Sequence, residues 1–222
     1  MWITESAKKG KKLKDMYSVS GIDVYIKDGL SEEIDPDFVF KYINARIPFY
    51  LTTGVDIIYI GDFPEMRERE INAYYQDGAI YVTNQQDDEM DMIDDIIHEL
   101  AHAVEGNNDE FIYGSGSIQR EFIAKRKNLA NVLNDMFDVP KDFFVNIEYD
   151  KEIDTFLFNT VGYDILNQMA VNIFVSGYAA TSVSEYFARG FEEYFIGDKS
   201  GLQKISPVLY SKIDELVHME DQ

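Results

Sequence analysis

The chain has 222 residues, 45% of them hydrophobic, and a formal net charge of −21 at pH 7. A chain of this length can bury a sizeable core as one domain, whereas its negative charge argues against nucleic acid and anionic membranes as partners. It has no cysteine, which excludes disulfides and thiolate metal sites and leaves histidine and carboxylate side chains as metal ligands.

The N-terminal residues are basic, unlike the rest of the chain. Residues 1–14 contain five lysines and a single acidic residue, Glu5. We expect residues 1–15 to form a basic, flexible arm. This segment lacks the apolar core of a secretory signal, and no later run is apolar enough to span a bilayer. These features favour a cytoplasmic protein, or one exported without such a signal, that has no membrane partner.

Several segments in the first half have the apolar patterns of strands and of a helix. The predicted strands are 21–28, 55–60, 71–75 and 79–83, and the predicted helix is 35–46. The last two strands should form a hairpin, because Asp77-Gly78 favours a tight turn. Ile80 and Val82 alternate with polar or amphipathic neighbours. This pattern suits an edge strand at 79–83, with an interior strand as the alternative.

A helical motif spans Met90–Gly106 and contains the most informative residues of the chain. Its apolar residues recur at helical spacing and form one face: Ile93, Ile96, Ile97, Leu100, Ala101 and Val104. His98 and His102 lie on the other side, four positions apart, so both imidazoles point into the same space. Glu99 completes the pattern H-E-x-x-H.

This spacing lets two imidazoles bind one zinc ion while the carboxylate reaches a water molecule. We therefore predict one Zn²⁺ per chain, with His98 and His102 as ligands and Glu99 as the catalytic base. The alternative is an amphipathic helix with two solvated histidines. Composition weakens that alternative, because two of only three histidines in the chain fall in this pattern.

Helical patterns dominate the second half. The predicted helices are 118–136, 153–174, 183–195 and 207–217, and the predicted loops are 106–116 and 176–181. This order predicts an α+β fold in a single domain, 1–222. A mixed-sheet lobe, 16–105, would carry the metal helix, and a helical lobe, 106–222, would follow, with the metal between them.

A zinc site of this kind needs a third protein ligand and an open position for water. Asn108 stands where a third histidine would follow the motif, and His218 is better explained as a solvated helix-end residue. A carboxylate is therefore favoured, and the candidates are Glu121, Glu185, Glu192 and Glu193. For Glu185 a structural role is also open, because Ser182-Val183-Ser184-Glu185 is a capping-box pattern.

Two motifs resemble the catalytic domain of anthrax lethal factor and the related Pro-Pro endopeptidases. The first is HELAHAV, which begins at His98. In the second, Tyr178 precedes Glu185 by seven positions, and Glu185 opens the sequence EYFA. The later segment LQKISPVLYSKIDELV also resembles the closing helix of that family. The resemblance implies that Glu185 is the third zinc ligand and that Tyr178 is a catalytic residue that donates a hydrogen bond to the oxyanion.

The chain departs from that family at two points. The stretch between His102 and Glu185 is longer than in its compact members, which predicts an inserted helix. Arg189 stands where the family often has an acidic residue.

The resemblance implies a zincin-like metalloprotease of the gluzincin type. Its expected function is that of a zinc-dependent endopeptidase that hydrolyses a peptide or protein substrate with a metal-activated water. The extended substrate is expected to pair with the strand 79–83. The alternative is a catalytically silent acidic protein, structural or inhibitory, that mimics a polyanion and retains a zincin fold; the intact Glu99 argues against it. No feature of the sequence indicates an oligomeric state.

Overall fold

The structure is a computed structural model that describes residues 17–219. The basic arm predicted for residues 1–15 lies outside the described residues. The chain divides into two compact units, the first ending at Asn107 and the second beginning at Asn108. A mixed sheet together with many helices makes this an α+β protein, which confirms the coarse class predicted from the sequence.

The first unit combines the sheet with three α-helices that the structure describes. Its elements are β1 (Tyr17–Val19), β2 (Ile22–Ile26), α2 (Pro36–Asn44), the 3-10 helix η1 (Phe49–Thr52), β3 (Ile57–Gly61), α3 (Pro64–Arg69), β4 (Ala73–Gln76), β5 (Ala79–Thr83) and α4 (Glu89–Asn107).

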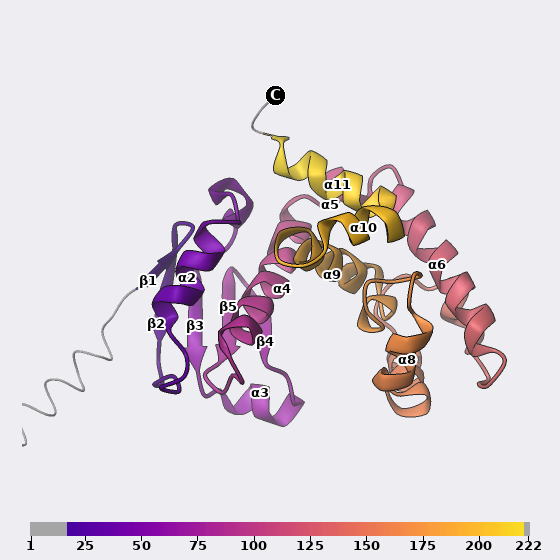
Figure 1. Ribbon diagram of the computed structural model, residues 1–222, viewed down its shortest axis with the longest axis horizontal. Helices are drawn as coiled ribbons and strands as arrows, with labels where there is room; N and C mark the ends of the chain where they lie inside the picture. Colours follow the sequence, from indigo (N-terminus) through magenta and orange to yellow (C-terminus); the bar gives the residue numbers. More distant parts are fainter. Residues whose placement is uncertain (1–16, 220–222) are drawn as a thin grey trace, which may run out of the picture. The chain divides into compact units, whose positions relative to one another are not determined.

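The five strands lie in the order β1-β2-β3-β5-β4 (Figure 1). The inner strands β2, β3 and β5 are parallel to one another, and β1 and β4 are antiparallel to their neighbours. Ile58, Ile60 and Ile80 are fully buried. Because successive side chains point to opposite faces, these residues share the face on which α2 and α4 pack. On the opposite face tyrosines of neighbouring strands contact one another in a row: Tyr25, Tyr59, Tyr81 and Tyr74.

The prediction that 79–83 is an edge strand is wrong. β5 pairs with β3 on one side and with β4 on the other, so it is an interior strand. Alternation of apolar and polar residues reports that one face of a strand is buried, and this holds for any strand of a sheet covered by helices on one face. It does not report how many neighbours the strand has.

The predicted hairpin is confirmed. β4 and β5 are joined by Asp77 and Gly78, with φ of 50° and 82°. Both values lie in the left-handed region, which Asp tolerates and Gly adopts without steric cost. The chain then leaves β5 and enters α4 through a polar segment in which the Gln86 amide donates to the Asp95 carboxylate at 2.8 Å. The hairpin therefore leads directly into the helix that carries the histidines.

The second unit is entirely helical over the residues that the structure describes. Its elements are α5 (Asp109–Tyr113), α6 (Ser117–Leu133), the 3-10 helix η2 (Lys141–Phe144), α7 (Lys151–Thr155), the π-helix η3 (Phe156–Val161), α8 (Tyr163–Met169), the 3-10 helix η4 (Tyr178–Ala180), α9 (Val183–Phe195), α10 (Lys199–Ile205) and α11 (Pro207–Val217).

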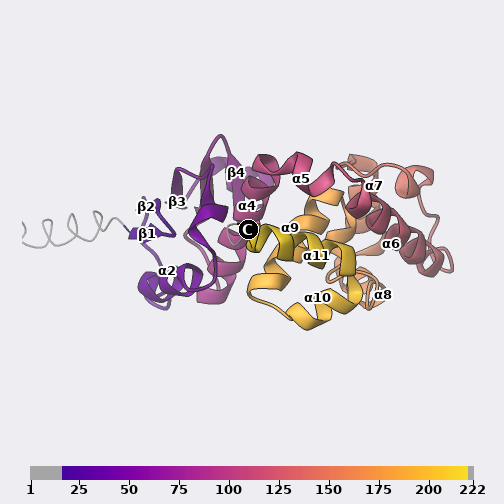
Figure 2. The ribbon, with the colours of Figure 1, turned by 90° about the horizontal axis from the view of Figure 1, so that it is seen from above.

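Helix α9 is central to the second unit and contacts α6, α10 and α11 (Figure 2). The predictions of helices at 183–195 and 207–217 are confirmed to the residue. The prediction of one helix over 153–174 is wrong, because α7 widens into the π-helix η3 and the chain turns at Gly162, whose φ is 79°. The predicted loop 106–116 contains the short helix α5. None of the helices in residues 17–219 is long and apolar enough to cross a membrane.

Candidate metal centre

His98 and His102 project from α4, and their positions follow from the amphipathic pattern of that helix. The apolar stripe is buried against the sheet and α2, with Ile93 and Ile97 fully buried. The histidines, on the other side, are partly exposed. Their Nε2 atoms lie 3.2 Å apart and their ring planes are inclined by 83°. The two Nε2 atoms therefore lie close enough beside the helix that both could bind one metal ion.

A carboxylate lies on the far side of the His102 ring. Glu105 Oε2 is 3.4 Å from His102 Nδ1, and both side chains are mostly buried. A carboxylate in this position favours the tautomer with the proton on Nδ1, which leaves the Nε2 lone pair available to a metal. We did not predict this role for Glu105. Its spacing of three residues after His102, on the same helical face, is a signal that could have indicated it.

Glu99 lies between the two histidines in the sequence and is 8% exposed. Nearby, burial raises the pKa of Asp95 to about 6, although the hydrogen bond from Gln86 opposes the shift and the charges of Asp94 and Glu99 add to it. This side of α4 therefore holds several acidic groups in partly desolvated surroundings.

In the second unit, Glu185 lies in the first turn of α9. Ser182 is the N-cap residue, and its Oγ accepts the backbone N–H of Glu185 at 3.1 Å. Of the two hydrogen bonds of the capping box expected from the sequence, the one that Ser182 Oγ accepts is therefore present. It fixes where α9 begins and so fixes the backbone position of Glu185.

Tyr178 begins η4, seven residues before Glu185. Its ring centroid is 5.9 Å from that of Tyr163, and the Arg189 guanidinium lies 5.5 Å from the Tyr178 ring centroid. Burial raises the Tyr178 pKa well above the ordinary value, and the negative charge of Glu185 adds to the shift. The hydroxyl therefore stays protonated at neutral pH and can donate a hydrogen bond. No sequence pattern pointed to Tyr163 as its neighbour.

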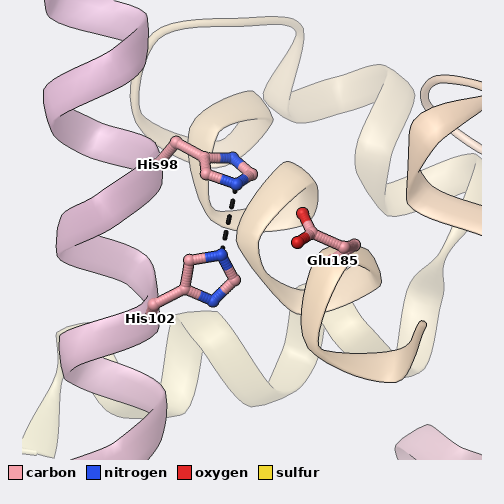
Figure 3. Close-up of side chains that lie close together, drawn as sticks. All are labelled: His98, His102 and Glu185. Atoms are coloured by element: carbon pink, nitrogen blue, oxygen red, sulfur yellow. Dashed lines mark hydrogen bonds between the residues drawn. The ribbon is translucent and has the colours of Figure 1, made fainter. Parts of the chain in front are cut away.

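One ligand atom from each of His98, His102 and Glu185 lies within 4.8 Å of the other two (Figure 3), so these residues could hold a metal ion. Among residues 17–219 no other group of three histidine or acidic side chains is arranged in this way.

Glu121, a competing candidate, has a structural role. Its two carboxylate oxygens accept the backbone N–H groups of Val208 and Leu209, at 3.0 and 2.9 Å, and the hydroxyl of Tyr186 at 2.8 Å. The N–H groups belong to the first turn of α11, where a helix has no internal acceptors for them. Glu121 therefore caps α11, and this use could not be read from the sequence because the two segments are far apart along the chain.

The other candidates are also placed outside the group. Glu192 accepts a 2.7 Å hydrogen bond from Arg189, and Glu193 accepts the backbone N–H of Asp198 at 2.8 Å. The side chain of His218 is 53% exposed at the end of α11. Its placement agrees with the interpretation of His218 as a helix-end residue.

Comparisons of the chain with protein-family models, with curated proteins and with solved structures found no match.

Proposed function

We propose that this protein is a zinc-dependent endopeptidase with a zincin-like fold of the gluzincin type. The observation that carries the proposal is the grouping of His98, His102 and Glu185, two imidazoles from an H-E-x-x-H helix and one distant carboxylate. The resemblance of the two motifs to the lethal factor and Pro-Pro endopeptidase family supports it.

The donor set suits one zinc ion per chain. Two nitrogen ligands bound at about 2.0–2.1 Å to a tetrahedral zinc ion are about 3.3 Å apart. The Nε2 atoms of His98 and His102 are separated by 3.2 Å. Two imidazoles and one carboxylate, without cysteine, match a catalytic zinc site that keeps its fourth position for water. Glu185 would supply the carboxylate.

The proposed mechanism assigns separate tasks to the side chains. Bound zinc would lower the pKa of a water molecule and polarise the carbonyl of the scissile peptide bond. Glu99 would accept the proton of the attacking water and later deliver it to the leaving amine nitrogen. Tyr178, protonated at neutral pH, would donate a hydrogen bond to the oxygen on which negative charge develops.

An extended substrate could pair with the sheet at β4, because β5 is an interior strand. The Thr83 N–H donates to the Asn72 carbonyl at 2.8 Å, next to the hairpin pairs. Bonded and non-bonded pairs alternate in an antiparallel ladder, so Tyr74 faces β5 and the backbone N–H and C=O of Ala73 and Tyr75 point outward. Within the described chain no strand covers this edge. A peptide strand added here would lie beside the sheet that supports α4.

The test combines metal content with cleavage. The purified protein should contain about one zinc per chain and should cleave members of a peptide library; a chelator should abolish cleavage and added zinc should restore it. Glu99→Gln is the matched control: it should keep zinc and lose at least about a hundredfold in rate. Absence of zinc would overturn the proposal. Zinc binding without cleavage would favour the silent acidic protein instead.

A further inference from the structure

Arg126 is the largest fully buried side chain in the described part of the protein. It extends from α6, and its guanidinium lies 4.5 Å from the ring centroid of Phe122 and 4.9 Å from that of Phe143. Burial lowers the Arg126 pKa to about 10, while the charge of Asp150 opposes this shift. The side chain therefore stays charged at neutral pH. A buried charge of this kind is costly unless it is fully hydrogen-bonded.

The guanidinium satisfies its donors with backbone carbonyls of two segments. Nε donates to the Ala180 carbonyl at 2.8 Å and Nη2 donates to the Thr181 carbonyl at 2.6 Å. Nη1 donates to the carbonyls of Phe143 and Asn146. The planar guanidinium presents its donors in a fixed geometry. It therefore fixes the distance between the two segments and also supplies hydrogen bonds to their carbonyl oxygens.

The Ala180 and Thr181 carbonyls lie at a particular place in the chain. Ala180 is the last residue of η4 and Thr181 is its C-cap residue, so both lie between Tyr178 and Ser182, the N-cap of the helix that carries Glu185. The start of α9 makes one further hydrogen bond to the loop after η2: the Val183 N–H donates to the Ile147 carbonyl at 2.7 Å. The backbone between Tyr178 and Glu185 is thus held from α6 and from the loop after η2.

We infer that Arg126 is a positioning residue that sets Tyr178 and Glu185 in their working places by holding the carbonyls between them. This inference rests on the proposed function, because it assigns a purpose to the position of two proposed site residues. Arg126 itself contacts neither the reacting atoms nor a ligand. On this inference, the helical segment between His102 and Glu185 contributes to the site through Arg126.

Lys125 provides a matched control on the same helix. It is also buried, and its Nζ donates to the carbonyls of Ile173 and Ile205, at 2.7 and 2.5 Å. Both acceptors lie outside residues 178–185, because Ile173 precedes this stretch and Ile205 is the last residue of α10. Removing either cation leaves buried carbonyls without a donor. Both losses should lower stability, but only the Arg126 loss should release the segment between Tyr178 and Glu185.

The experiment compares Arg126→Lys, Arg126→Met and Lys125→Met in the full chain, at temperatures below the thermal midpoint of each variant. Zinc dissociation constants are measured by competition with a chelator, and amide hydrogen exchange is measured on the metal-free protein. Arg126→Met should weaken zinc binding at least about tenfold, the usual size of an outer-shell effect. It should also speed exchange over residues 178–185, and Arg126→Lys should lie between wild type and Arg126→Met. Lys125→Met should leave both quantities as in wild type.

The positioning role would be overturned if Arg126→Met and Lys125→Met had equal zinc affinities and equal local exchange at similar losses of stability. If Arg126→Met does not fold, the same comparison between Arg126→Lys and Lys125→Met decides. If the wild type binds no zinc, the proposed function fails. The exchange experiment on metal-free protein would still decide whether Arg126 holds the 178–185 segment.

Discussion

The Nε2 atoms of His98 and His102 lie 3.2 Å apart on successive turns of α4. Their ring planes are inclined by 83°, and the ring centroids are 4.8 Å apart. Glu105, 3.4 Å from the opposite nitrogen of His102, limits rotation of that ring. The first unit therefore presents two imidazole nitrogens that are already placed to bind one metal ion.

Replacement of either histidine should remove the metal. His98→Ala and His102→Ala each leave one nitrogen ligand of the pair, so zinc should fall from about one per chain to near zero after dialysis. Metal analysis of the purified variants measures this. His218→Ala, which changes an exposed histidine, should retain full occupancy. Full occupancy in both helix variants would place the metal elsewhere.

Variants of Glu185 and Ser182 should distinguish a metal-ligand role of Glu185 from a role in capping α9. Glu185→Ala removes a proposed ligand and should weaken zinc binding by orders of magnitude. Ser182→Ala removes the acceptor of the Glu185 N–H and should cost about 1 kcal/mol of stability with zinc retained. Zinc affinity and thermal midpoint are measured on both variants.

Three carboxylate variants serve as controls for this pair: Glu121→Ala, Glu192→Ala and Glu193→Ala. Glu121→Ala should lower stability because it uncaps α11, and all three should keep zinc. Zinc retained in Glu185→Ala but lost in one of the controls would transfer the ligand role to that residue.

Tyr178→Phe should keep zinc and lower kcat by about a hundredfold or more, the usual cost of losing a donor to a developing oxyanion. The phenyl ring preserves the contact with Tyr163, so the fold should be unchanged. Steady-state kinetics on a cleaved peptide measures the effect. Tyr194→Phe, which removes a hydroxyl bonded to Asp214 at 2.6 Å, should leave kcat unchanged. An effect confined to KM would place Tyr178 in substrate binding.

Asp95 should make the metal-free protein less stable as the pH rises from about 4 to about 6. Burial raises its pKa from 3.8 to about 6 in the folded state, so over this range the folded chain holds a proton that the unfolded chain has released. Stability then falls with increasing pH, by up to about 3 kcal/mol at 1.4 kcal/mol per pKa unit.

Asp95→Asn should remove this dependence and be more stable than wild type at pH 7, because asparagine can still accept the hydrogen bond from Gln86. Urea unfolding in the presence of a chelator, at pH 4 and pH 7, measures the difference between the two proteins. The same change of stability with pH in both would show that Asp95 does not titrate in this range.

Part of this structure was predictable because it depends on local sequence. The helical stripe of α4 places His98 and His102 on one side whatever packs on the other. Asp77-Gly78 adopts positive φ at both residues, which few other residue pairs tolerate. Ser182 marks the first residue of α9 through a hydrogen bond that spans only three residues. Each of these features involves neighbours within one or two turns of the chain.

Other features were mispredicted because periodicity does not record contacts. The pattern of β5 is that of a strand with one buried face, and only pairing with β4 makes it interior. The apolar residues of 153–174 are compatible with one long helix. The turn at Gly162 and the π-helix before it break that helix, and both depend on packing in the second unit, where Phe156 meets Phe137 and Phe143.

The sequence by itself determined the helix with the H-E-x-x-H motif and the common side of its two imidazoles, because i and i+4 positions of a helix always share a face. It did not determine which carboxylate joins them. Tertiary structure decided that Glu121 caps α11 and that Glu185, not another of the candidate carboxylates, groups with the two histidines where a metal ion could be held. It also decided that a buried Arg126 holds the backbone before α9. Such assignments depend on contacts between residues more than fifty positions apart, and no local pattern encodes them.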